Sequence, residues 1–92
     1  MMKLRTSNRF LHKVSRLIKT NPATKNKIDE ALILLEKDIF TPSLSTHKLK
    51  GKLNGYWSSS AGYDLRIIFE ISEEENEKVI ILHSVGSHDE VY

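Results

Sequence analysis

Histidine, arginine and lysine are the residue types through which this chain could perform acid–base chemistry on a phosphodiester. His47 and His88, two of four histidines, lie outside the predicted helices and strands, in loops where catalytic groups are commonly placed. RNA supplies its own nucleophile, the 2′-hydroxyl, so its cleavage requires a base, an acid and a cation for the phosphate charge. Histidine suits both proton transfers near neutral pH, and the guanidinium fork of Arg66 matches two phosphate oxygens. Such a site forms only in a fold that gathers these residues.

A run of alternating lysines could add nucleic-acid binding to this chemistry. Lys48, Lys50 and Lys52 would project to one side of an extended segment and form a basic ridge for phosphates. A solvated loop face explains the same pattern. The other two histidines have plainer interpretations, because His12 falls on the outer face of a predicted helix and His83 lies inside a predicted strand.

The sequence disfavours metal-dependent, nucleotide-dependent and acyl-transfer enzymes. It has no cysteine, no two histidines four residues apart on a predicted helix, and no carboxylate cluster on a predicted rigid element. Its four glycines form no phosphate-binding loop, and no GxSxG motif is present. We therefore predict a protein with no metal site and no small-molecule cofactor.

Charge is distributed unevenly along the chain. Residues 1–52 contain 12 Lys and Arg against 4 Asp and Glu, whereas residues 53–92 contain 2 against 8. This asymmetry indicates either ordinary solvation of a helical half and a hairpin tip, or a basic surface for a polyanion. The longest apolar runs fall far short of the ~20 residues of a membrane span. The absence of cysteine fits a reducing compartment, so we expect a cytoplasmic protein with no membrane partner.

Apolar periodicity in the first half predicts a strand followed by two helices. Met1–Arg5 is a candidate first strand, and Asn8–Lys19 is a predicted helix with Ser7 or Thr6 as its N-cap. The apolar residues of this first helix recur at helical spacing and form one stripe: Phe10, Leu11, Val14, Leu17 and Ile18.

A second helix is predicted from Asn21-Pro22, an N-cap followed by proline at the first helical position, to about Asp38. Its apolar face consists of Ile28, Ala31, Leu32, Leu35 and Ile39. The connection between the two helices is short, so they should form an antiparallel hairpin. Residues 43–55 follow as a loop or irregular stretch.

The second half favours strands. From Leu65 to Ser72 apolar residues alternate with Arg66, Ile68 and Glu70, which is the period of a strand with one nearly pure apolar face. Val79–Val85 is rich in β-branched residues and reads as another strand. The acidic segment 73–77 should close a hairpin between them.

Arg66 should point away from this apolar face. The alternative is a structural arginine, on an edge strand or paired with Glu70 two residues on.

Taken together, the elements predict a single α+β domain over residues 1–92. A short N-terminal strand and a two-helix antiparallel hairpin pack on one face of an antiparallel sheet of about three to four strands, and the other face stays available.

Three segments in the second half resemble the RelE/YafQ toxin family, in order and in spacing: HKLKGKLNGY (47–56), GYDLRIIFEI (62–71) and SVGSHDEVY (84–92). The first half agrees only as a pattern of a strand and two helices. The resemblance implies a microbial-ribonuclease-like α+β fold. It also implies a metal-independent endoribonuclease that cleaves mRNA on the ribosome and is neutralised by a cognate antitoxin.

The resemblance also suggests which residues act. Histidines of the YafQ branch match His47 and His88, the acidic residue that opens the central strand matches Asp64, and Arg66 looks like the phosphate-binding arginine of the RelE group. Tyr92 matches the aromatic residue of the C-terminal motif, a tyrosine that contributes to catalysis in RelE itself. We expect His88 to be the general acid and His47 the general base, with Asp64 orienting a histidine or raising its pKa.

The chain also departs from the YafQ pattern, with Ser60 in place of a further histidine and Leu65 in place of a tryptophan. Two other functions stay open. One is a ParE-like toxin that poisons DNA gyrase by binding it, although such toxins generally lack the histidine and arginine set. The other is an RNA-binding relative without catalysis, which would bind RNA in a salt-sensitive way and produce no cuts.

Overall fold

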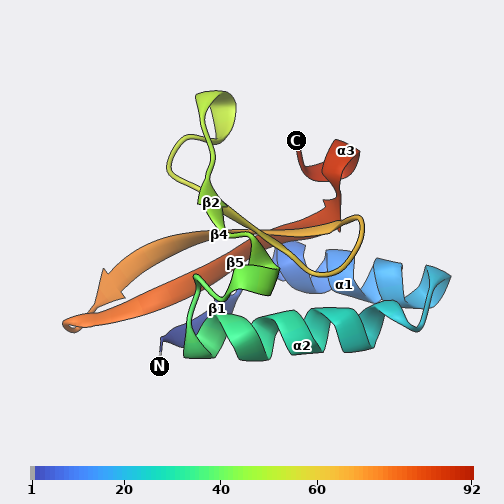
Figure 1. Cartoon of the computed structure of the whole chain (residues 1–92), viewed down its shortest axis with the longest axis horizontal. Coiled ribbons are helices and arrows are strands. Elements are labelled where there is room, and N and C mark those ends of the chain that lie inside the picture. The colour runs from blue at the N-terminus through green and yellow to red at the C-terminus, as the bar shows by residue number, and fades with distance from the viewer. Residues whose placement is uncertain (1) are drawn as a thin grey trace.

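A computed structural model describes residues 2–92 and shows two helices beneath a twisted sheet (Figure 1). Its elements, in chain order, are β1 (Lys3–Thr6), α1 (Asn8–Thr20), α2 (Thr24–Lys37), the 3₁₀ helix η1 (Pro42–Leu44), β2 (His47–Lys48), the 3₁₀ helix η2 (Gly51–Leu53), β3 (Trp57–Ser60), β4 (Leu65–Glu74), β5 (Glu77–Ser87) and α3 (His88–Val91). The predicted first strand included Met1, which lies outside the described residues. None of the helices within residues 2–92 is long and apolar enough to cross a membrane.

The sheet has five strands in the order β1-β5-β4-β3-β2. The predicted α+β class and the helical hairpin on one face are confirmed, but the sheet is mixed rather than antiparallel, because β1 pairs with β5 in parallel. The fifth strand, β2, is only two residues long and pairs with β3 at the edge. A strand this short has no measurable period, which is why the sequence predicts a loop there.

Ser7 determines where α1 begins. Its hydroxyl accepts a hydrogen bond from the Phe10 N–H at 3.1 Å and donates one to the His83 carbonyl at 3.2 Å. The cap therefore also ties α1 to β5, and the predicted start of the helix is confirmed. In contrast, α2 begins later than predicted. Asn21 accepts from the Ala23 N–H at 3.2 Å and forms a turn with Pro22, so that the helix starts at Thr24.

The core lies between the helices and one face of the sheet. Most of its fully buried residues come from α1, α2, β4 and β5, among them Phe10, Ile28, Leu35, Ile67, Phe69, Ile80 and Leu82. The predicted face of α2 is confirmed, whereas the α1 stripe is narrower than predicted. Leu11 is 52% exposed, and Phe10 is the one fully buried residue of that helix.

The β4–β5 hairpin is long and bulged. Glu75 and Asn76 have φ angles of 51° and 68°, the left-handed geometry of a two-residue hairpin turn, so most of the acidic segment 73–77 is strand rather than connection. Ile68 pairs with Ser84 but Phe69 pairs with Leu82, which leaves His83 as an extra residue.

The sheet face turned away from α1 and α2 is called the open face here. Figure 1 shows the segment around β2 and η2, and the C-terminal α3, projecting on this side of the sheet. The open face therefore lies between these two projecting segments, one near the β2 edge of the sheet and the other at the C-terminus.

Candidate active site on the open face

Two rows of directly paired residues run across the open face. In the first, His47 pairs with Ser58, Ser58 with Ile68, and Ile68 with Ser84. In the second, Ser60 pairs with Arg66 and Arg66 with Gly86. Residues directly opposite each other share a face, and Ile67 between the two rows belongs to the core. Both rows therefore face away from the helices.

Tyr92 reaches over the first row. Its hydroxyl donates a hydrogen bond to the Ser58 hydroxyl. Since Tyr92 follows β5 and Ser58 belongs to β3, the side chain must span β4, and Ile68 beneath it is only 1% exposed. The Ser84 hydroxyl is buried in the same row, and no hydrogen-bond partner for it occurs within residues 2–92.

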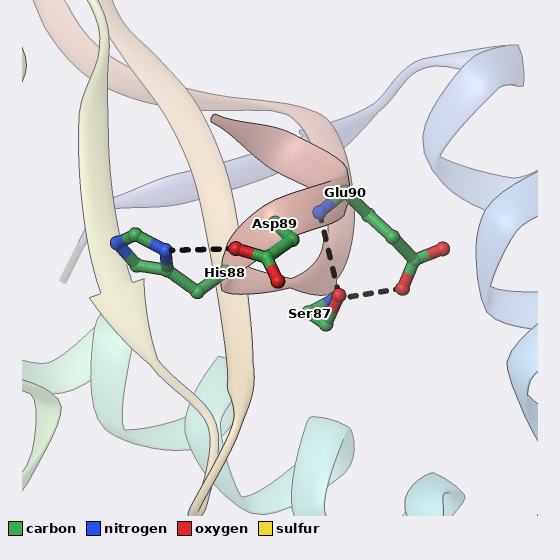
Figure 2. Close-up of polar contacts among 4 residues, drawn as sticks. All are labelled: Ser87, His88, Asp89 and Glu90. Atoms are coloured by element: carbon green, nitrogen blue, oxygen red, sulfur yellow. Dashed lines mark hydrogen bonds and ion pairs between the residues drawn. The ribbon is translucent and has the colours of Figure 1, made fainter.

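His88 is exposed at the start of α3 and contacts Tyr92 edge-on, with ring centroids 4.5 Å apart. Its Nδ1 lies 3.7 Å from the Asp89 carboxylate (Figure 2). An ion pair exists at this distance only when the ring is protonated, which is the form that a proton donor requires. The prediction that His88 lies in a loop is wrong, because a reciprocal cap turns residues 88–91 into a short helix.

This cap is made by Ser87 and Glu90 (Figure 2). The Ser87 N–H donates to the Glu90 carboxylate at 3.0 Å, and the Glu90 N–H donates to the Ser87 hydroxyl at 3.3 Å. The helix also packs closely on the sheet. A Cβ added at Gly86 would lie 3.2 Å from the Glu90 Cβ, so glycine leaves the space that α3 occupies. The cap and this close packing hold His88 and Tyr92 above the open face.

We expect the docking of α3 to weaken in acid. The backbone N–H of Ser87, then its hydroxyl, and then the charges of Lys13 and Arg16 lower the pKa of Glu90. A lowered pKa in the folded state contributes stability above the carboxyl's ordinary pKa of about 4.3, and that stability is lost as the pH falls through the lowered value. The protection factors of the Glu90 and Tyr92 amides, which correct for the intrinsic pH dependence of exchange, should therefore fall below this range. A Glu90→Gln variant should show little of this pH dependence, and equal acid sensitivity in both proteins would exclude Glu90 as its origin.

His47 is exposed on the edge strand β2, not in a loop as predicted. Its Nδ1 lies 2.9 Å from the Ser45 carbonyl oxygen. A carbonyl can only accept, so Nδ1 carries the proton, and in the neutral ring Nε2 keeps a free lone pair. That is the tautomer which can take a proton from a substrate hydroxyl. Ser45 itself has a left-handed backbone conformation, with φ of 48°.

Arg66 is partly buried in the interior strand β4. Its Nη1 donates to the Leu65 carbonyl at 3.0 Å and lies 3.5 Å from the Ser60 hydroxyl. Neither structural alternative holds, because β4 is not an edge strand and no salt bridge within residues 2–92 joins Arg66 to Glu70. Most of the guanidinium's donors stay available to an anion on the open face.

The remaining predicted residues are not gathered with this group. Asp64 is exposed in the turn before β4, and it forms no ion pair with another described residue. Lys48 pairs with Trp57, and its Nζ lies 5.3 Å from the centre of that ring, on the side opposite His47. Gly51, with φ of 69°, begins the 3₁₀ helix that contains Lys52.

The prediction of one extended lysine ridge is therefore wrong, because the backbone coils before its third lysine. Sequence reasoning also missed Tyr56, Ser58 and Ser84 on the open face. The alternation from Leu65 to Ser72 gives the face of Arg66, but only the register with β3 and β5 shows which serines lie beside it. Among residues 2–92, no group of three or more His, Asp or Glu side chains is placed to hold a metal ion.

Comparison with known proteins identifies the class to which this α+β fold belongs. Residues 2–92 match the family described as the bacterial toxin of type II toxin–antitoxin system, YafQ. The chain belongs to this family. A comparison with curated protein sequences found no match.

Solved structures show the same fold at low sequence identity. YafQ from E. coli strain BL21(DE3) is 16% identical with a TM-score of 0.78, over 100% of this chain and 99% of that one. The YoeB/ParE toxin from Agrobacterium tumefaciens is 21% identical with a TM-score of 0.77, over 95% of this chain and 99% of that one. The E. coli DinJ-YafQ complex also matches, at 17% identity and a TM-score of 0.73, over 100% of this chain and 99% of that one.

Proposed function

We propose that this toxin is a metal-independent endoribonuclease that cleaves mRNA on the ribosome. The observation that carries the proposal is a continuous path of contacts on the open face. His88 contacts Tyr92, and Tyr92 hydrogen-bonds to Ser58. Ser58 is the partner of His47 in the sheet. Two histidines far apart in the sequence thus belong to one surface, and Arg66 lies in the adjacent row.

The roles follow from the chemistry of each group. His47 Nε2 takes the proton of the 2′-hydroxyl, whose oxygen attacks the adjacent phosphorus. The bond from phosphorus to the 5′-oxygen breaks, and His88 donates a proton to that oxygen. Arg66 balances the extra negative charge on the phosphate as it develops. The products are a 2′,3′-cyclic phosphate and a 5′-hydroxyl, with no redox step and no external nucleophile.

Asp64, Tyr92 and the lysines have secondary roles in this proposal. Tyr92 orders the site by bridging α3 and β3, while Lys48, Lys50 and Lys52 attract the nucleic-acid backbone from an exposed segment. Asp64, which is exposed in the turn before β4, is the proposed partner that orients a histidine when RNA is bound. The ribosome and mRNA are the proposed partners of the open face.

A cognate antitoxin protein is the proposed inhibitor. The support is that a chain of this fold, E. coli YafQ, forms a complex with DinJ. Residues 1–52 carry 12 basic residues against 4 acidic ones, so an antitoxin segment rich in Asp and Glu would suit this half of the toxin. Covering α3 would block His88 and Tyr92 together.

Translation of a defined mRNA in a cell-free system, read by primer extension, tests the proposed function. We expect discrete cuts inside codons when ribosomes, mRNA and the purified toxin are all present, and none when ribosomes are left out. Cuts with the same positions and rates on free RNA would contradict ribosome dependence. Intact mRNA with normal protein synthesis would contradict the nuclease altogether and would redirect attention to DNA gyrase.

A further inference from the structure

We propose that Tyr56 and His83 form a stacking subsite for one nucleobase of the bound RNA, beside the position of the cleaved bond. The inference rests on the proposed function, since it takes RNA as the ligand of the open face. It adds a binding element that neither the histidine pair nor the arginine supplies.

The two rings come from opposite ends of the chain's second half and meet on the open face. Their centroids are 4.8 Å apart, and their planes are tilted by 37°. Tyr56 directly precedes β3, and its carbonyl accepts from the Leu49 N–H at 2.9 Å, which extends the pairing of β2 with β3. It lies two residues before Ser58, so the alternation of a strand puts both side chains on the same face.

The bulge in β5 brings His83 to this position. Leu82 belongs to the core and Ser84 to the open row, so the extra residue between them interrupts the alternation and contacts Tyr56. A regular strand cannot place two successive residues on the same face. Bulges commonly occur beside functional sites, where they redirect one side chain.

Neither ring is needed by the core. Both are half-buried, and neither belongs to the cluster packed beneath the helices. Among residues 2–92, the Tyr56 hydroxyl and the His83 ring nitrogens make no hydrogen bond to another residue, so the ring contact and not a polar contact joins the pair. Beside them, Ser84 is 4% exposed, and its hydroxyl has no hydrogen-bond partner within residues 2–92.

A nucleobase is the ligand that fits these properties. Proteins bind unstacked RNA bases mainly on tyrosine, phenylalanine, tryptophan and histidine rings, and hydrogen-bond their exposed edges. Two residues of a strand span about 6–7 Å, so the aromatic pair lies one such step from the row of His47 and Ser58. An RNA strand with its cleaved phosphate at that row would place a neighbouring base over the pair.

Binding of an uncleavable RNA tests the subsite separately from catalysis. The probe is a short single-stranded oligonucleotide of 2′-O-methyl RNA, which has no free 2′-hydroxyl, added to the full-length toxin. We expect Tyr56→Leu to raise the dissociation constant about ten-fold through lost stacking, and Tyr56→Phe to stay within about two-fold of the wild type. The matched control is Tyr63→Leu, because Tyr63 is 96% exposed in the turn before β4.

Ring-proton shifts in the wild-type protein report stacking directly, so they do not depend on whether a variant folds correctly. In the wild-type protein, the oligonucleotide should shift the ring-proton resonances of His83 upfield, whereas those of His12 on α1 should not move. Unshifted His83 resonances in the bound protein, or equal affinities for Tyr56→Leu and Tyr63→Leu, would overturn the subsite. If ribosomes show no cleavage while the His83 shift and the Tyr56→Leu defect persist, the nuclease fails and the subsite stands.

Discussion

A His88→Ala variant is expected to cleave ribosome-bound mRNA about a hundred- to ten-thousand-fold more slowly than the wild type, the usual effect of removing a general acid. The leaving 5′-oxygen is a poor leaving group unless it is protonated as the bond breaks. His88 is exposed, and its protonated form can pair with Asp89 at 3.7 Å. Among residues 2–92, His88 is the one histidine whose ring contacts that of Tyr92, so we expect no other ring to take over the proton transfer. Single-turnover cleavage rates on a programmed ribosome measure this loss.

His12→Ala is the matched control, because His12 is also exposed but lies on α1, away from the open face. Both replacements should change the free energy of unfolding by no more than about 0.5 kcal/mol, as is usual for surface positions. Cleavage should fail in the His88 variant alone. A folded His88→Ala protein that cuts at the wild-type rate would show that another group protonates the leaving oxygen.

The sequence predicts best those features that depend on neighbours along the chain. Ser7 caps α1 through its own side chain, and the alternation in β4 follows from one face being buried, so both are readable without a partner strand. The parallel pairing of β1 with β5 joins residues more than seventy positions apart. No local pattern encodes that pairing, and it is why the sheet is mixed rather than antiparallel.

The candidate site shows the same difference between local and long-range features. His47, Arg66 and His88 are recognisable by residue type and by resemblance, but the path between them is not. It depends on Tyr92 spanning β4 to reach Ser58, a contact between residues 34 positions apart. The position of His83 depends on a bulge in β5, where the pairing with β4 shifts by one residue. A histidine inside an apolar strand otherwise indicates a structural residue.

Graded replacement of Arg66 should separate charge from geometry in the proposed reaction. Arg66→Ala is expected to lower the cleavage rate about a hundred- to a thousand-fold, the range seen when one group that stabilises a developing oxyanion is lost. Arg66→Lys should fall between the alanine variant and the wild type, because lysine keeps the charge but lacks the planar fork that meets two phosphate oxygens. The loss should appear in kcat rather than in KM, since the charge on the phosphate grows only as the 2′-oxygen attacks.

The structural contacts of Arg66 offer the competing explanation, and the same series distinguishes it. Its hydrogen bond to the Leu65 carbonyl and its approach to Ser60 together contribute about 1 kcal/mol to folding, which is too little to unfold the domain. A Ser60→Ala variant removes the second contact while keeping the guanidinium, so it should cleave at close to the wild-type rate. If Ser60→Ala loses as much activity as Arg66→Ala, the arginine acts by ordering β3 against β4. If Arg66→Ala raises KM and leaves kcat unchanged, the arginine of the wild-type protein binds the RNA backbone equally in the ground and transition states. A loss confined to kcat, graded from lysine to alanine, leaves stabilisation of the phosphate charge as the explanation.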